Sequence, residues 1–555
     1  MRQNRSLGWA LTLAFGVSFA LWGQGGRNQA GRGAPPGQTG AQGATGNAAG
    51  RGGRAGDAAA GNGAAARGTL DFYTYDSSAP AGQPIPDAPP VEAHQKVAIN
   101  GQTLAYTSRA GYLPLHNATT GQAEAHIFYT SYWKDGVSDA AARPLVFFLG
   151  GAPGVSAAWQ DFGGLGPRRM KPVTEGSPAS VENPYTLLPE ADLVFVNPVG
   201  TAFSRPDHPD RAPGFWNTVT DVASLGEFVR GYITRFDRRS SPLFLAGEDW
   251  GTGRAAGLAA YLIEHQVPVR GVALFSMTMS GDALAGDTQY LTQLPSLVMA
   301  AWTHKKLAPE LNAMSSEQIA GQARQFASRE YLHALYKGDR MTAEERTKAI
   351  ADLSRLTGVS KAFVVSNNLR ITLDRFNAEL LRDQQRALSN SDARVTGFVP
   401  VAAGGGRGGR GGFGFPPPPP LDFNLSALAP SFLTAYDAYL RRDLTFNANP
   451  GAIFYLNEGG VGAFNSTGND DTSLAAAFAR NPNLRLFVSL NYFDLNAPFY
   501  AGEFTLAHLS VSPEVRAHNI TVSHLEAGQM PYLDSKALVK LHTDLAGFVN
   551  QAVRQ

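Results

Sequence analysis

The stretch that decides the fold reads Gly-Glu-Asp-Trp-Gly at residues 247–251. It has the form of a G-x-S-x-G nucleophile turn, but Asp249 occupies the position of the serine. An apolar run that favours a strand, residues 242–246, precedes the turn, and small residues that favour a helix, 252–261, follow it. A strand, a sharp turn and a helix in this order hold the central side chain above the carboxyl end of a sheet. The segment therefore predicts the scaffold of a nucleophile site without its usual nucleophile.

Composition fits a large globular protein with tails of low charge. The 555 residues are 43% hydrophobic and 17% charged, enough for one large domain with insertions. The net charge of +1 gives no reason to expect nucleic acid as a partner. The chain has no cysteine, so no disulfide supports it. No motif requires a cofactor, and the oligomeric state does not follow from the sequence.

The amino-terminal residues have the pattern of an export signal. Two arginines precede an apolar run at residues 7–22, and small residues lie near its end. We predict a signal peptide at residues 1–23 and a periplasmic or extracellular location, with an uncleaved anchor as the alternative. The run is too short and too early for stable membrane insertion as a spanning helix. Residues 24–67 are rich in Gly, Ala and Arg and are predicted to form a disordered arm.

The next segments predict strands. A tight hairpin is expected at residues 97–106, because Asn100 and Gly101 supply two positive-φ positions. Another strand is expected at residues 125–133. Apolar runs with room for helical crossovers between them then recur, which is typical of a mainly parallel sheet. These runs are residues 145–149, 193–196, 243–246, 272–275, 484–490 and 520–525.

A helical region separates the last two strands from the others. Helical periodicity predicts helices at residues 316–336, 342–356 and 373–387. These features together predict an α/β-hydrolase fold, with a mainly parallel central sheet, helices on both faces and a helical cap insertion. The core is expected at residues 68–279 and 451–555, and the cap at residues 280–450. A Gly-Arg and proline-rich stretch at residues 402–420 is expected to be a low-complexity loop within the cap.

Other polar motifs follow the predicted strands. Residues 149–154 read Leu-Gly-Gly-Ala-Pro-Gly, and successive glycines after a strand let backbone N–H groups converge as in an oxyanion hole. Asp494 and Gln529 follow the last two strands. In the chain order nucleophile, acid, base, the three positions are Asp249, Asp494 and Gln529.

Several ordered motifs resemble peptidase family S10, the serine carboxypeptidases, and especially its bacterial members. That family has Asn-Gly-Gly-Pro-Gly after a strand, Pro-Val-Gly-Thr-Gly-Phe/Tyr-Ser, Gly-Glu-Ser-Tyr-Gly at the nucleophile, and an aspartate and Gly-His near the carboxyl terminus. The resemblance covers the chain from about residue 70 to its end. The matching stretches are residues 150–154, 198–204, 247–251, 492–499 and 526–532.

The resemblance implies an active site that has changed at two of its three central positions. Asp249 takes the place of the family serine and Gln529 that of the family histidine, whereas Asp494 keeps the family aspartate. A serine peptidase needs a hydroxyl nucleophile and a base that accepts its proton. Gln529 cannot accept a proton near neutral pH, and Asp249 is a poor nucleophile toward amides.

The resemblance also implies the substrate-binding positions. Gly150 stands where the family has an asparagine that binds the terminal carboxylate of the substrate, and Glu248 keeps a family glutamate with the same role. Backbone N–H groups of Gly151, Ala152 and Trp250 are the expected oxyanion hole, with Ala152 in place of a glycine.

The family reaction removes carboxyl-terminal residues from peptides, and we predict that this chain has lost it and acts as a binding protein for a peptide or small molecule. Glu248, Asp249 and Asp494 would converge without a histidinium, so the pocket suits an amine, a cation or a neutral ligand. No His or Cys accompanies the three acids at ligand spacing, so no metal is expected.

Two other functions stay open. Asp249-Trp250 resembles the Asp-Trp pair of epoxide hydrolases and haloalkane dehalogenases, so Asp249 could be the nucleophile toward an epoxide or ester. That reaction needs a histidine, and the nearest candidate in sequence is His524. A structural role in the cell envelope, through residues 24–67, is the third hypothesis.

Overall fold

The computed structural model describes residues 85, 87–171, 176–277, 279, 281–399, 422–448, 452–456, 464–465 and 472–554. All of them belong to the second of two compact units, Gly63–Gln555. The predicted signal peptide (1–23), arm (24–67) and low-complexity loop (402–420) lie outside these residues. In the described ranges, no helix has the length and apolar content that crossing a membrane requires.

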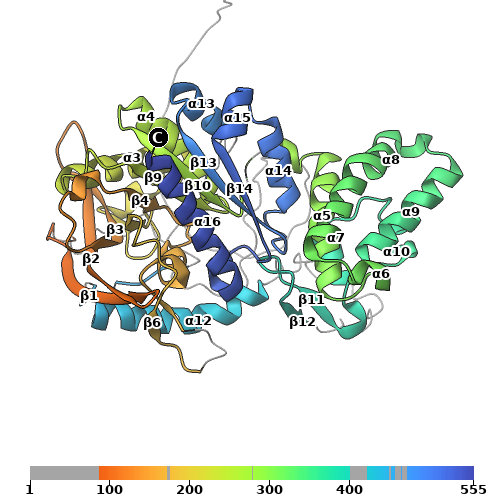
Figure 1. Cartoon of the computed structure of the whole chain (residues 1–555), viewed down its shortest axis with the longest axis horizontal. Helices are drawn as coiled ribbons and strands as arrows, with labels where there is room; N and C mark the ends of the chain where they lie inside the picture. Colours follow the sequence, from red (N-terminus) through yellow and green to blue (C-terminus); the bar gives the residue numbers. More distant parts are fainter. Residues whose placement is uncertain are drawn as a thin grey trace, which may run out of the picture. The chain divides into compact units, whose positions relative to one another are not determined.

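A ten-stranded sheet forms the centre of this unit (Figure 1). Its strands lie in the order β1-β2-β3-β7-β4-β9-β10-β13-β14, and β8 pairs with β3 at the side. The six strands from β7 to β14 run parallel to one another. Their bounds are β1 Val91–Ile99, β2 Gln102–His116, β3 Ala123–Lys134, β4 Leu145–Phe148, β7 Asp192–Val196, β8 Arg205–Pro206, β9 Leu243–Glu248, β10 Val269–Phe275, β13 Arg485–Asn491 and β14 Ile520–Leu525.

The predicted strands are confirmed. The hairpin of β1 and β2 turns at Asn100 and Gly101, whose φ angles are 50° and 77°. Each of the six apolar runs becomes one of the parallel strands, and alternate side chains of a strand enter different clusters. In β4, Phe147 belongs to the hydrophobic cluster on one face and Phe148 to the cluster on the other. The sheet is therefore buried on both faces, as its continuous apolar runs require.

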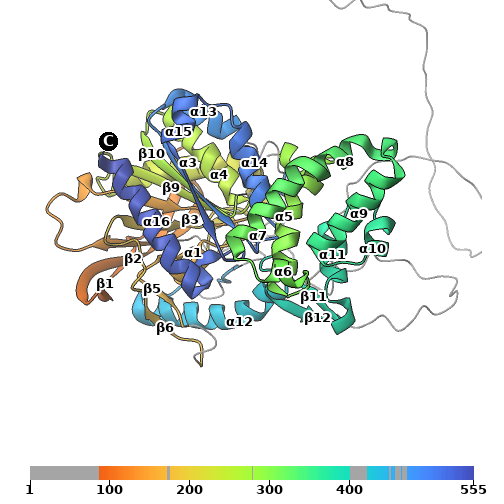
Figure 2. The same ribbon diagram turned by 45° about the vertical axis from the view of Figure 1, so that its right-hand side comes forward.

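Helices cover both faces (Figures 1 and 2). Side chains of α3 (Thr218–Arg235) and α4 (Gly251–Glu264) belong to the first cluster. Side chains of α12 (Phe423–Ala438) and α16 (Ser535–Arg554) belong to the second. Further helices after β10 and β13 are α13 Thr472–Arg480, α14 Phe499–His508 and α15 Pro513–His518.

The region between β10 and β13 is mainly helical. It contains α5 Thr288–Thr303, α6 Pro309–Asn312, α7 Ser316–Phe326, η6 Ala327–Tyr331, α8 Leu332–Lys337, α9 Ala343–Thr357, α10 Lys361–Ser366 and α11 Leu373–Glu379, and then a two-stranded sheet of β11 Arg386–Leu388 and β12 Thr396–Phe398. The helix predicted at 342–356 is confirmed, and that at 316–336 is divided by the π-helical turn η6.

The prediction of a helix at residues 373–387 is wrong in its second half. The helix ends at Glu379, and Gln385 adopts a left-handed conformation with φ of 55° before β11. The pairing of β11 with β12, which periodicity within one segment does not encode, decides the conformation there.

Helix α12 also differs from the other helices of this region. It contacts β5 (Arg168–Met170) and β6 (Ser180–Glu182), a small sheet attached to the core. Its Phe432 packs against Trp159 in a tilted arrangement, with ring centroids 4.1 Å apart. In Figure 1, α12 accordingly lies beside the core, and α8 to α10 lie farther out.

Candidate functional site

Asp249 lies at the sharp turn between β9 and α4 with φ of 51°. Its backbone N–H donates to the carbonyl of Phe275 over 2.9 Å, and its carbonyl accepts from the hydroxyl of Thr252 over 2.6 Å. The turn has no room for side chains at its ends: a Cβ on Gly247 would lie 2.0 Å from the carbonyl oxygen of Gly251. The geometry of a nucleophile turn is therefore present, with a carboxylate at its tip.

The loop after β4 packs directly against this turn. A Cβ on Gly251 would lie 2.2 Å from the carbonyl oxygen of Gly150, which itself has φ of 70°. Within the described ranges, no group accepts a hydrogen bond from the backbone N–H of Gly151, Ala152 or Trp250. The three predicted oxyanion donors thus lie on two adjoining segments and have N–H groups available to a ligand.

Arg254 joins the two segments from behind. Its guanidinium, 1% exposed, donates to the carbonyl oxygens of Leu149 (3.0 Å) and Gly151 (2.7 Å) and to the carboxylate of Asp221 (2.6 Å). It also lies 5.0 Å from the ring centroid of Trp250. Because these bonds occupy the guanidinium, Arg254 positions the loop and does not face the cavity as a free cation.

Asp494 is fully buried after β13. Burial raises the pKa of Asp494 well above its ordinary value, and the negative charge of Asp249 raises it further. Hydrogen bonds from the backbone N–H groups of Ala497 and Asn496 lower it. Those N–H groups donate to Oδ1 over 3.0 and 2.9 Å. Oδ2 has no hydrogen-bond partner among the residues that the structure describes. The charge of Asp249 thus contributes to the raised pKa of Asp494.

Gln529 follows β14, and its side chain is engaged by a neighbour. Its Oε1 accepts from Nδ2 of Asn496 over 2.8 Å. Its backbone N–H donates to the carbonyl of Ser391 (2.6 Å), and its carbonyl accepts from the hydroxyl of Ser276 (2.6 Å). An amide held in this way has no basic site to take a proton from a nucleophile.

His524 is held away from this role. Its Nε2 lies 2.7 Å from Oε1 of Glu503, a carboxylate that also accepts from Arg324 of α7. Its ring stacks with that of Tyr492 at a centroid distance of 5.7 Å. His524 therefore belongs to a polar contact between the helical region and β14, and it does not line the cavity described below.

Glu248 lies beside Asp249 and is 2% exposed. Burial raises the pKa of Glu248 to about 8, and the negative charge of Asp249 also raises it. Two hydrogen bonds lower this pKa: one from the hydroxyl of Tyr532, which donates to Oε2 over 2.5 Å, and one from the side-chain amide of Gln160. The carboxyl is thus largely protonated at neutral pH, which removes one negative charge from the site.

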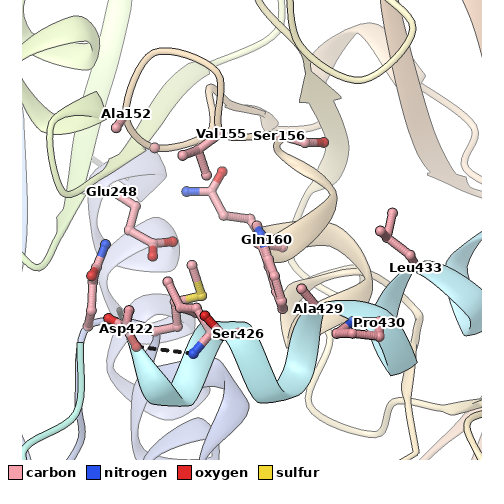
Figure 3. A pocket seen from close by; sticks show the side chains of 15 residues that line it. Ala152, Val155, Ser156, Gln160, Glu248, Asp422, Ser426, Ala429, Pro430 and Leu433 are labelled. Atoms are coloured by element: carbon pink, nitrogen blue, oxygen red, sulfur yellow. Dashed lines mark hydrogen bonds between the residues drawn. The ribbon is translucent and has the colours of Figure 1, made fainter. Parts of the chain in front are cut away.

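A cavity of about 690 Å³ opens beside these residues. One side is formed by the oxyanion loop, Glu248 and Gln529, and the other by one face of α12 (Figure 3). The lining residues of α12 and its N-cap recur at helical spacing: Asp422, Leu425, Ser426, Ala429, Pro430 and Leu433. Polar groups gather near Glu248 and Asp422, and apolar side chains line the end near Pro430 and Leu433 (Figure 3).

This wall is the part of the site that sequence reasoning missed. Asp422 caps α12, because its Oδ1 accepts from the N–H of Leu425 over 3.1 Å. The same oxygen accepts from the hydroxyls of Ser389 (2.7 Å) and Ser391 (2.8 Å). Ser391 in turn holds the backbone of Gln529. The helical spacing in the sequence signals an amphipathic helix, but not which cavity it faces.

None of the described residues that line the cavity is basic. Asp422 and Glu248 supply its carboxyl groups, and Asp249 adds its charge nearby. In the same described ranges, no group of three or more His, Asp or Glu side chains is arranged to hold a metal ion. Among the residues that the structure describes, the site offers backbone donors, amides and carboxyls, but no general base of the histidine type.

Comparisons with known proteins agree with this architecture. The family model for serine carboxypeptidase (peptidase family S10) matches residues 99–392, which is more than half of the chain. Serine carboxypeptidase-like 50 of Arabidopsis thaliana is 25% identical over 264 residues, which cover 47% of this chain and 54% of that protein. Serine carboxypeptidase-like 45 of the same plant is 24% identical over 208 residues, 36% of this chain and 41% of that protein. The matches thus span about half of the length of these relatives.

A solved structure supports the fold. The prohormone-processing carboxypeptidase Kex1Δp of Saccharomyces cerevisiae aligns with a TM-score of 0.51 at 13% identity, covering 80% of this chain and 91% of that one. Together with the parallel sheet and its helices on both faces, this likeness confirms the predicted α/β-hydrolase fold. The match to the family model also confirms the resemblance first seen in the motifs, and the chain therefore belongs to the serine carboxypeptidase family, S10.

Proposed function

We propose that this member of the serine carboxypeptidase family has lost proteolysis and acts as a binding protein for a peptide or small molecule. The observation that carries the proposal is the pairing of Asp249 at the turn with Gln529 in the slot that the resemblance assigns to the base. The Gln529 amide accepts a hydrogen bond from Asn496 and cannot take a proton. Without hydroxyl and base, a triad retains at most the contribution of the oxyanion hole and of substrate binding, roughly a thousandfold over water.

Electrostatics favour a ligand other than the family substrate. The charge of Asp249 raises the pKa of both Glu248 and Asp494, and none of the described cavity-lining residues is a cation. The terminal carboxylate of a peptide would meet like charge, at a cost on the order of 1–4 kcal/mol at about 4 Å. An amine, a cation or a neutral group avoids this cost.

Turnover of blocked dipeptides, small esters and epoxides tests the proposal. The chain from Gly68 onward, its Asp249→Ala variant and an Asp249→Ser/Gln529→His double variant are compared. We expect no turnover difference between the first two, whereas labelling by a fluorophosphonate is expected only in the double variant, because Oδ2 of Asp494 is available to a histidine. Turnover of the unmodified chain that disappears in Asp249→Ala would refute the loss of catalysis.

The second candidate is a hydrolase that uses Asp249 as nucleophile toward an epoxide or ester. The positive φ of Asp249 and the available N–H groups of Ala152 and Trp250 favour it. The candidate histidine, His524, is not placed to activate water at Asp249, because its Nε2 lies within hydrogen-bond distance of Glu503. An ester formed on Asp249 should therefore persist, and a stable mass increase after incubation with an epoxide would favour this candidate.

We further propose that the protein is exported, on the evidence of residues 1–23, and that it is of the bacterial type within its family. Its expected partners are small ligands, not nucleic acid. Fractionation of cells that express the full chain tests the location, and amino-terminal sequencing of the mature protein tests cleavage. Recovery of the uncleaved chain in the cytoplasm would contradict export.

A further inference from the structure

A second cavity, of about 330 Å³, lies at the other edge of the sheet from Asp249. Asp249 follows the carboxyl end of β9, whereas this cavity is lined by residues at the amino ends of β9 and β10 and in the turn before β13. Arg239 and Arg270 are among these residues, and none of the described lining residues is acidic. The second cavity therefore has the opposite charge to the first.

Arg270 reaches this cavity through an irregularity of β10. Val269 pairs with Leu243 of β9. Gly271 pairs with Phe244, the next residue of β9, so Arg270 is an extra residue in β10. An extra residue of this kind redirects a side chain out of the regular alternation of a strand. The side chain of Arg270 makes no hydrogen bond or ion pair with another described residue, although the residue is half-buried.

Arg238, in the same loop as Arg239, shows how this part of the fold binds a structural guanidinium. Arg238 is 1% exposed and donates to the carboxylate of Asp192 over 2.7 Å. Arg239 is exposed, and its guanidinium donates to the hydroxyl of Thr234 over 2.9 Å but has no carboxylate partner among the described residues. The positive charges of Arg239 and Arg270 are thus both left for solvent or a ligand to balance.

The turn that carries Arg239 is fixed and has free donors. The N–H of Ser241 donates to the carbonyl of Arg238 over 3.1 Å, which closes a turn with Arg239 and Ser240 at its centre. Nε of Arg238 also donates to the hydroxyl of Ser241, over 2.8 Å. The backbone N–H groups of Arg239 and Ser240 donate to no other described residue. These N–H groups and the hydroxyl of Ser240 are therefore available to an acceptor.

The opposite wall is held in place by an asparagine. Nδ2 of Asn481 donates to the carbonyl of Val269 over 2.9 Å, and its Oδ1 accepts from the N–H of Asn483 over 3.2 Å. These bonds attach the turn before β13 to the residue that precedes Arg270. Because both walls are ordered before a ligand binds, binding loses little conformational entropy.

We propose that the second cavity binds a phosphate group, either free phosphate or the head of a phosphomonoester, with Arg239 and Arg270 as its counterions. A guanidinium donates two parallel hydrogen bonds to two oxygens of a phosphate. Two guanidiniums, the Ser240 hydroxyl and two backbone N–H groups exceed what the two oxygens of a carboxylate can use, whereas a phosphate group has at least three terminal oxygens. The volume leaves room for the organic part of an ester. The proposal does not depend on the proposed function of the site at Asp249.

Isothermal titration calorimetry of the full chain with inorganic phosphate, glycerol 3-phosphate and acetate tests the proposal. The titrations are made near pH 7.5 at constant ionic strength. We expect phosphate to bind with a Kd of about 1 mM or below, and acetate at least about tenfold more weakly. Binding of glycerol 3-phosphate at least as tight as that of phosphate would identify a phosphomonoester as the ligand, and binding of phosphate alone would identify the free anion.

Variants locate the binding. Arg270→Gln and Arg239→Gln should each weaken phosphate binding by at least about tenfold. Arg441→Gln removes an exposed arginine that pairs with Asp437 outside this cavity, and it should bind phosphate as the unmodified chain does. This control is needed because the arginines of residues 24–67 and 402–420 also attract anions. Arg270→Gln removes no bond to a described residue, so its urea midpoint should be unchanged.

The outcomes decide between the site and general attraction of anions. Phosphate binding that is lost in both cavity variants and kept in Arg441→Gln supports the proposal. Acetate binding as tight as phosphate binding overturns the ligand class. No binding at about 10 mM phosphate, or equal binding by the unmodified chain and a folded Arg270→Gln variant, overturns the site. If Arg270→Gln does not fold, the exposed Arg239→Gln decides by the same criterion.

Discussion

Replacing Glu248 by Gln should change how stability depends on pH. The pKa of Glu248 is raised from 4.5 to about 8 in the folded chain, chiefly by burial. A carboxyl with a raised pKa binds more protons in the folded state. Its contribution to stability is therefore complete below about pH 4.5 and is lost as the pH rises toward about 8. Gln stays neutral throughout and can still accept the hydrogen bond from Tyr532.

The expected magnitude follows from one proton. Each pH unit between the two pKa values changes the free energy of unfolding by about 1.4 kcal/mol. From about pH 5.5 to about pH 7.5 the unmodified chain should thus lose about 2–3 kcal/mol more than Glu248→Gln does. Asp161 and Asp494, whose pKa values are also raised by burial, contribute to both proteins alike.

Urea unfolding at several pH values measures this difference. Glu503→Gln is the control, because hydrogen bonds from His524 and Arg324 lower the pKa of Glu503 although burial opposes them. Its contribution is lost only as the pH falls below about 4.5, so this variant should keep the slope of the unmodified chain between about pH 5.5 and 7.5. Equal slopes for Glu248→Gln and the unmodified chain, within about 0.5 kcal/mol over this range, would refute the assignment of a buried, protonated Glu248.

Three other substitutions test how the site is held. Arg254→Met should lower the free energy of unfolding by about 3–5 kcal/mol, because it leaves the buried carboxylate of Asp221 unpaired. Adding Asp221→Leu should recover part of this loss. A double variant as unstable as the single one would contradict the reasoning. Gly247→Ala should destabilise by about 3 kcal/mol or more, since the new Cβ meets the Gly251 carbonyl, and an unchanged urea midpoint would show that the turn can relax. Arg324→Met should lower the free energy of unfolding by about 2 kcal/mol and speed amide hydrogen exchange in α7, because it removes the bond to Glu503 on α14. Unchanged exchange would show that this bond does not hold α7 in place.

The fold could be predicted where local signals agree. Continuous apolar runs identify strands that are buried on both faces, and Asn100-Gly101 identifies a hairpin because few residues adopt two successive positive φ angles. The turn at Asp249 could be recognised because Gly247 is required by a contact with Gly251, within the turn itself. Each of these features is encoded in a short segment.

The cavity could not be predicted, because its walls come from distant segments. Gln160 resembles any polar residue of a short helix until Gly150 fixes its amide. Likewise, Asp422 is an ordinary helix cap until Ser389 and Ser391 attach it to the segment that holds Gln529. The partners that fix these side chains lie 10 residues away for Gln160, and 33 and 31 residues away for Asp422, and one sequence contains no pattern that names such partners.

The proline in α12 has a consequence for the range of ligand sizes. Pro430 lies inside the helix and has no N–H, so the carbonyl of Ser426, one turn earlier, lacks its helical partner. Both residues face the cavity. The N-terminal end of α12 is anchored through Asp422, so bending of the helix is easiest at this turn. A longer or bulkier ligand would therefore be accommodated by a change in the curvature of α12. The cavity-lining groups near Asp422, at the anchored end of the helix, would keep their positions.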